Sequence, residues 1–129
     1  MTWTGVLLAL LISHMVGDVL LQTDWQAVNK TRSPREQEGR RALLQHVTVY
    51  TVAFVPALVW IGAHATVGRV IVVGAVVAIP HLLIDDGTIV RAWVRHVKGA
   101  ARPSLGLLIA VDQSFHVLCL LGAALIAVA

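Results

Sequence analysis

The stretch that decides the fold class is VGRVIVVGAVVAIPHLLID, residues 67–85. A membrane core ~30 Å thick is crossed by a helix of roughly 20 mainly apolar residues, and this stretch has that length and composition. It closes with His81 and Asp85, which lie four residues apart and therefore share one helix face. Residues 67–85 thus predict a membrane-spanning helix with a polar pair near one end.

Three other stretches have the same apolar character, and we expect them to span the membrane at Trp3–Leu21, Ala42–Gly62 and Leu105–Val128. Alternation of apolar and polar residues is absent, and the runs are longer than the strands of a membrane barrel. A chain of 129 residues has the size of one domain. The predicted fold class is therefore all-α: an integral membrane four-helix bundle, up-down-up-down, with residues 1–129 as a single transmembrane domain.

The composition excludes several classes of protein. Apolar residues make up 57% of the chain and charged residues 13%, with a mean hydropathy of +0.79, whereas soluble domains carry about 25% charged residues. Cys119 is the only cysteine, so an internal disulfide and a thiolate zinc cluster are excluded. A cleaved signal peptide is the alternative for the first apolar run. The absence of positive charge before it, and His14 and Asp18 within it, favour a retained span.

The predicted loops carry their own helix signals. In the first loop, Ser33 has the character of an N-cap, Pro34 of a first helical residue and Glu36 of a capping-box partner. In the third loop, residues 89–97 place apolar side chains at helical spacing with Arg91 and Arg95 between them. We expect a short amphipathic helix there, lying on the lipid headgroups.

Positive charge is distributed unequally between the two sides of the predicted bundle. Nine of the ten lysines and arginines fall in the first and third loops, and Arg69 lies near the opposite side. By the positive-inside rule those loops face the cytoplasm, which predicts a multi-pass protein of the bacterial inner membrane with both termini outside. The expected partners of these charges are membrane lipids with anionic headgroups, not nucleic acid. A homo-oligomer or a membrane protein partner stays open.

Polar residues inside the spans are the strongest functional signal. An aspartate at the centre of a spanning helix costs ~2.5 to 3.5 kcal/mol, whereas a leucine or valine returns only ~0.3 to 0.6 kcal/mol. Such groups must therefore face the interior and have partners. Each predicted span carries at least one of them, mainly in the cytoplasmic half of the membrane, and together they are His14, Asp18, His46, His81, Asp85, Asp112 and His116.

Imidazole and carboxylate groups together are typical ligands of a transition metal, with zinc expected first and manganese or iron as alternatives. Seven groups exceed the needs of one tetrahedral ion. Either two metals share bridging carboxylates, or some aspartates orient the ligating imidazoles. Gln22, Tyr50 and Gln113 adjoin these groups and are candidates for hydrogen bonds to them. Without a metal, the same residues would be packing contacts between helices or a path for protons or ions.

The sequence also resembles a known family. His14 to Trp25 has the pattern HxxGDxxLQxDW, and it is followed by His46, by the HxxxD pair at residues 81–85 and by DQxxH at residues 112–116. These motifs resemble the DUF3307 family of small bacterial and phage membrane proteins, a domain of unknown function. The similarity covers nearly the whole chain. It looks distantly like proteins labelled membrane-bound metal-dependent hydrolases.

The pattern favours a hydrolase over a conductor or a structural subunit. A bound metal lowers the pKa of water toward ~7, which suits attack on an ester or phosphoester, and a lipid-derived substrate fits the depth of the site. In that interpretation the four histidines are metal ligands. The catalytic candidates are Asp18, Asp85 and Asp112, and each of them would bind a metal, bridge two metals or act as the general base. Metal or proton transport and a non-enzymatic structural or regulatory membrane subunit are the alternatives.

Overall fold

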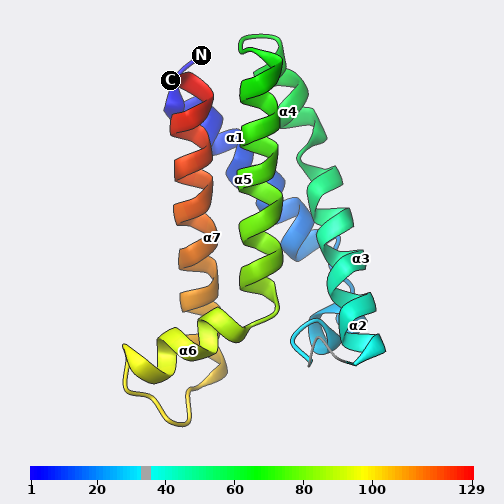
Figure 1. Cartoon of the computed structure of the whole chain (residues 1–129), viewed down its shortest axis with the longest axis vertical. Coiled ribbons are helices and arrows are strands. Elements are labelled where there is room, and N and C mark those ends of the chain that lie inside the picture. Colours follow the sequence, from blue (N-terminus) through cyan, green and yellow to red (C-terminus); the bar gives the residue numbers. More distant parts are fainter. Residues whose placement is uncertain (33–35) are drawn as a thin grey trace.

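The computed structural model describes residues 1–32 and 36–129, which form seven α-helices and one π-helical turn and contain no strand. The prediction of an all-helical chain is therefore confirmed for these residues. Four long helical segments run side by side, and the two termini lie together at one end of them (Figure 1). The short helices α2 (Asp24–Asn29) and α6 (Thr88–His96) lie at the opposite end.

The first segment changes its helical form just where the polar residues begin. Helix α1 spans Trp3–Met15 and continues into the π-helical turn η1, Val16–Leu20. Single π-turns inside helices are frequently found at functional sites. Gly17 brings this turn close to α3 (Gln37–Ala53), because a Cβ atom there would lie 3.1 Å from the Cα of Tyr50. The turn therefore places Asp18 against the neighbouring helices.

Helix α2 was not predicted from the sequence. It begins with a capping box in which the Thr23 hydroxyl accepts a hydrogen bond from the Gln26 backbone, while the Gln26 side chain accepts one from the Thr23 backbone. This helix packs against the start of α3 and ends at Lys30. Part of the segment that was predicted to be a loop is thus helical and packs against α3.

The second predicted span is broken, which corrects the expectation of one helix over residues 42–62. Helix α3 already begins at Gln37, and it is followed after Phe54 by α4 (Val55–Gly62), inclined to it by 41°. Pro56 explains the break, because proline lacks a backbone N–H and its ring clashes with the carbonyl four residues earlier. Ser33 and Pro34, the predicted N-cap and first residue of the helix in the first loop, lie outside the described residues, and Glu36 is the N-cap of α3 without a side-chain capping bond, not a capping-box partner.

The remaining long helices are α5 (Val67–Asp85) and α7 (Leu105–Val128), and both occupy the ranges expected from the sequence. Thr66 and Ser104 cap their first turns with side-chain hydrogen bonds. Between them lies α6, the short helix expected in the third loop. Gly87 permits the sharp turn from α5 into α6, since it adopts a φ of 74°.

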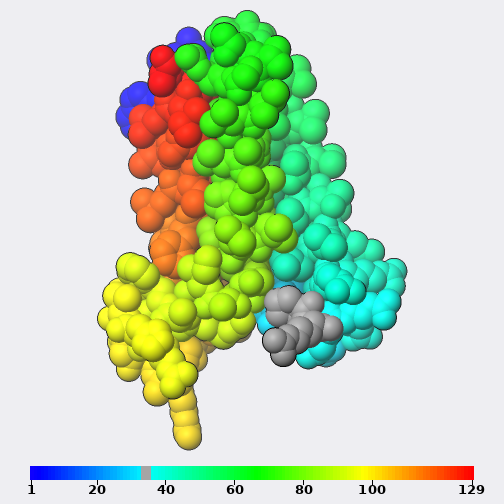
Figure 2. Space-filling view, viewed as in Figure 1, coloured from blue at the N-terminus to red at the C-terminus, as the bar shows by residue number. Residues whose placement is uncertain are grey.

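The long helices bury two different kinds of side chain along their length. Helix α7 packs between α1 and α5, and α5 also contacts α3 and α4. Toward the termini the core is aliphatic and aromatic, with Leu10, Phe54, Ile61 and Leu120 fully buried or nearly so. Toward α2 and α6 the buried residues include the histidines and aspartates, beside a smaller apolar cluster of Ile84, Val90, Val94 and Val111. At this end the short helices and loops make the molecule wider than the long helices alone (Figure 2).

Three helical segments are long and apolar enough to cross a membrane: Trp3–Leu20, Val67–Asp85 and Leu105–Val128. The bent pair Gln37–Ala53 and Val55–Gly62 provides a fourth if it is counted as one span. The structure thus has three or four candidate spans among the described residues.

Candidate metal centre

Four helical segments bring their polar residues to one buried place. Asp18 comes from η1, His46 from α3, and His81 and Asp85 from successive turns of α5. The last two share a face because they lie four residues apart. His116 joins them from α7. All five are buried, and the side chains of His46 and Asp85 have no exposed surface.

The side-chain atoms of four of these residues meet at His46 Nε2. This nitrogen lies 2.9 Å from Asp85 Oδ2, 3.2 Å from Asp18 Oδ1 and 3.1 Å from His81 Nε2. His81 Nε2 is in turn 3.3 Å from Asp85 Oδ2. One imidazole nitrogen has a single lone pair or a single proton, so it cannot form three separate hydrogen bonds in these directions.

The same spacing fits a bound transition metal. Zinc bonds nitrogen and oxygen at about 2.0–2.2 Å, so two donors of a tetrahedral ion lie about 3.3–3.5 Å apart. The distances around His46 Nε2, 2.9–3.2 Å, are slightly shorter than that value, and the four donor atoms all lie within 4.8 Å of one another. We call Asp18, His46, His81 and Asp85 the four-donor group. Two imidazoles and two carboxylates are a suitable donor set for zinc, manganese or iron.

A second group shares one residue with the first. Asp85, Asp112 and His116 also offer ligand atoms within 4.8 Å of one another. His116 Nδ1 lies 3.0 Å from the backbone carbonyl of Asp112 and 3.4 Å from its Oδ2, whereas Nε2 lies 3.5 Å from Asp85 Oδ1. Asp112 is the least buried of the three aspartates, with 25% of its side chain exposed.

His14 lies beside these groups but belongs to neither. Its Nε2 is 2.9 Å from Gln113 Oε1, and its Nδ1 is 3.1 Å from the hydroxyl of Tyr50. Because an amide oxygen only accepts, Nε2 carries the proton and Nδ1 accepts from Tyr50. Gln113 Nε2 then donates to Asp18 Oδ2 at 2.9 Å. His14 therefore connects Tyr50 to Asp18 through hydrogen bonds, and both of its ring nitrogens are already used.

A cavity of about 580 Å³ adjoins the two groups. Asp18, Asp85 and Asp112 line its polar side, together with the cationic side chains of Lys30 and Arg91. Most of the other lining residues are apolar, among them Val19, Val90, Leu105 and Leu108, and Gln22, Thr31 and Gln113 are polar. The cavity thus has a charged inner surface and an apolar flank.

Comparison with protein families matches the chain to the family described as Protein of unknown function (DUF3307) over residues 6–129. The chain belongs to the DUF3307 family. The matched range contains both groups and the cavity-lining residues. No curated protein and no solved structure matches the chain.

The structure brings together six of the seven residues that the sequence singled out as metal ligands. Of the three residues expected to hydrogen-bond to them, Tyr50 and Gln113 contact His14. Gln22 adjoins Lys30 and His46, and with its amide group turned so that the oxygen faces Lys30 it accepts from Nζ at 2.7 Å and donates to the backbone carbonyl of Asp18 at 3.2 Å. Tyr50 also stacks on the ring of His81, with centroids 3.4 Å apart and planes inclined by 3°.

Lys30 is the residue that sequence reasoning missed, because it was assigned to the basic first loop. Its Nζ donates to Asp85 Oδ2 at 2.7 Å and lies 3.5 Å from both Asp18 Oδ1 and His46 Nε2. The pattern of Thr23 followed by Gln26 is a capping-box signal and could have predicted the helix that delivers Lys30. With neutral imidazoles, this one ammonium balances only one of the two buried carboxylates of the four-donor group.

Proposed function

We propose that the protein is a membrane-embedded, metal-dependent hydrolase, built as a four-helix bundle and acting on an ester or phosphoester, with a lipid-derived substrate favoured. The observation that carries the proposal is the four-donor group. Its atoms come from three separate helical segments, are buried and lie within 4.8 Å of one another, and His46 Nε2 is 2.9–3.2 Å from a ligand atom of each of the other three residues. With neutral imidazoles, Lys30 balances one of the two buried carboxylates, so a divalent cation would complete the balance of charge.

The outer surface of the helices supports insertion into a membrane. Large apolar side chains point outward along the long helices, such as Leu8, Val59, Ile71 and Leu118, each at least 60% exposed. A surface of this kind is stable in lipid and unfavourable in water.

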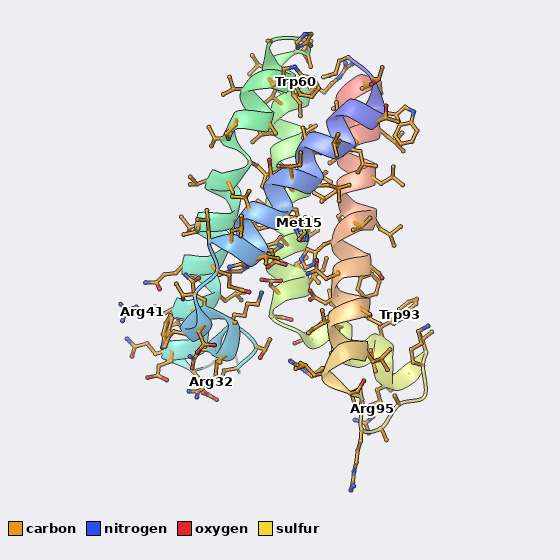
Figure 3. All side chains as sticks on the ribbon, turned by 180° about the vertical axis from the view of Figure 1, so that it is seen from behind. Met15, Arg32, Arg41, Trp60, Trp93 and Arg95 are labelled. Atoms are coloured by element: carbon orange, nitrogen blue, oxygen red, sulfur yellow. The ribbon has the colours of Figure 1, made fainter. Side chains whose placement is uncertain are left out.

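The ends of the molecule support the same interpretation. Trp60 lies at the end near the termini, and Trp93 at the opposite end (Figure 3). Tryptophan is enriched at both membrane interfaces. The labelled Arg32, Arg41 and Arg95 all lie at the end of Trp93. We therefore propose that this end faces the cytoplasm and that both termini lie outside.

Zinc is the cation that suits the four-donor group best, because two imidazoles and two carboxylates supply the four nitrogen and oxygen ligands that it prefers. When bound, such an ion would act as a Lewis acid and make water more acidic. Asp18, His46, His81 and Asp85 would hold it. The hydrogen bonds from Gln22 and Gln113 would fix Asp18, and stacking on Tyr50 would fix the ring of His81.

The adjoining cavity supports an amphipathic substrate. Lys30 and Arg91 offer positive charge to a phosphate or carboxylate next to the carboxylates of the site. Leu105 and Leu108 provide an apolar wall along which a hydrocarbon chain can lie. A lipid-derived phosphoester has both features, so it is the substrate class that we favour.

Lys30 supports one rival function. An ammonium that already contacts Asp85 and Asp18 could neutralise part of the cluster without a metal. The protein would then be a structural or regulatory membrane subunit whose polar groups fix the arrangement of its helices. Transport of protons or metal ions is less favoured, since the buried core toward the termini is aliphatic and aromatic.

Elemental analysis of the full chain purified in detergent separates these functions. We expect at least one equivalent of divalent metal, and its loss in both Asp18→Asn and His81→Ala. The matched controls are Asp24→Asn and His64→Ala, which change exposed residues of the same types and should keep the metal. A wild-type protein that remains folded and binds no added zinc or manganese would contradict the proposal.

Hydrolysis of a panel of phosphoesters and lipid esters then tests the reaction itself. We expect activity in the metal-loaded protein, its loss after chelation and its return when metal is added. Metal binding without turnover of any member of the panel would favour a carrier over an enzyme.

A further inference from the structure

The contact between Asp85 and His116 is not explained by the four-donor group. The two side chains are buried, with 1% and 2% of the residues exposed. Asp85 Oδ1 and His116 Nε2 face each other at 3.5 Å, and neither atom has a hydrogen-bond partner among the described residues. Buried polar atoms without partners are rare and call for a physical explanation.

The proton on His116 can be placed from its other nitrogen. His116 Nδ1 lies 3.0 Å from the carbonyl oxygen of Asp112, which only accepts, so Nδ1 carries the proton. In a neutral ring Nε2 then has a free lone pair. A lone pair and a carboxylate oxygen facing each other inside the protein repel unless a proton or a metal cation lies between them.

The two oxygens of Asp85 face different partners. Oδ2 lies 2.9 Å from His46 Nε2 and 3.3 Å from His81 Nε2, within the four-donor group. Oδ1 faces His116 instead. A carboxylate oriented in this way is typical of a ligand that bridges two metal ions, which in two-metal enzymes lie about 3.5–4 Å apart.

We infer that the protein binds a second divalent cation between Asp85 Oδ1, His116 Nε2 and the carboxylate of Asp112, and that Asp85 bridges it to the first. The inference rests on the proposed metal at the four-donor group. Asp112 is the part-exposed member of the set and lines the cavity, so the second cation would be reached from there. An ion held there would lie beside the cavity and would supply positive charge to an entering phosphate group, as the metals of two-metal phosphoesterases do.

Manganese is a suitable probe, because two neighbouring Mn²⁺ ions give a spin-coupled electron paramagnetic resonance spectrum that a single ion does not. The purified full chain is loaded with Mn²⁺, freed of excess metal and analysed for bound equivalents. We expect two equivalents and a coupled spectrum for the wild type. His116→Ala should retain one equivalent with an uncoupled spectrum, and His96→Ala, which changes an exposed histidine of α6, should match the wild type.

Asp112→Asn provides a second variant in case His116→Ala does not fold. It changes a part-exposed residue and keeps the side-chain volume, and it should weaken the second site at least tenfold while the first stays occupied. A wild type with one equivalent and an uncoupled spectrum, lost in His81→Ala but unchanged in His116→Ala, would overturn the second site and leave the proposed function standing. A folded wild type that binds neither Mn²⁺ nor Zn²⁺ would overturn both.

Discussion

The two ends of the long helices have the same helical backbone but bury different kinds of side chain. Toward the termini, Leu10, Phe54 and Leu120 fill the interior and need only complementary shape. Toward α2 and α6, the interior contains imidazoles and carboxylates, each of which needs a partner of suitable charge and direction. We call these the apolar end and the polar end. Substitutions at the apolar end should lower stability by graded amounts, whereas the interactions at the polar end depend on particular side-chain atoms.

The boundary between the two ends is one helical turn of α3. Phe54 belongs to the apolar core, and its ring centroid is 4.8 Å from that of Tyr50, four residues earlier. Tyr50 turns its hydroxyl toward His14 and its ring face toward His81. The change from packing to hydrogen bonding therefore occurs within a single side chain.

The largest expected effect on stability comes from the apolar end. Leu120→Ala should lower the free energy of unfolding in detergent by ~2 to 4 kcal/mol, because a buried leucine leaves a cavity that its neighbours fill only in part. Metal content should stay at the wild-type level, since Leu120 belongs to the apolar core. Denaturant titration and elemental analysis of the same preparation check both statements. A loss of metal in the folded variant would show that the two ends are not independent.

Replacement of Lys30 tests the charge balance of the polar end. Lys30→Met should tighten zinc binding by ~10-fold, because the ammonium near Asp85 and Asp18 competes with a bound cation. The metal-free variant should be less stable than wild type, since both carboxylates are then left without a cation. Competition with a zinc chelator and thermal unfolding with and without zinc measure the two effects.

Arg32→Met is the matched control for this experiment. Arg32 pairs with Glu38 at 3.0 Å on the exposed surface, so its loss should change stability by less than ~1 kcal/mol and leave zinc binding unchanged. Weaker zinc binding in Lys30→Met would mean that the ammonium helps to hold the site together, and it would favour the structural function.

The smallest effect is expected at the boundary itself. Tyr50→Phe removes the hydrogen bond to His14 but keeps the ring that stacks on His81, so it should cost ~1 kcal/mol of stability. Zinc affinity should fall only a few-fold, because Tyr50 reaches Asp18 through His14 and Gln113. Unfolding and zinc titration of the variant provide the measurement. An effect on zinc larger than that of Lys30→Met would show that Tyr50 acts directly on the metal ligands.

Some features of the polar end could be predicted because they are local. The i,i+4 spacing of His81 and Asp85, and of Asp112 and His116, places each pair on one helix face whatever the fold. The lengths of the apolar runs gave α5 and α7 directly. The break in the second span was missed because Pro56 lies in an otherwise uniform apolar run, although its effect on the backbone is a local one.

The amino-acid sequence by itself determined that the chain is helical, that its helices are apolar along most of their length and that their imidazoles and carboxylates cannot be left in an apolar environment without partners. These properties depend on residue type and on spacing along one helix. Only the tertiary structure decided that His14 stands apart from the candidate ligands, that Lys30 contacts the four-donor group and that the two oxygens of Asp85 face different histidines. Contacts between segments far apart in the sequence depend on how helices pack, and helical periodicity does not encode that.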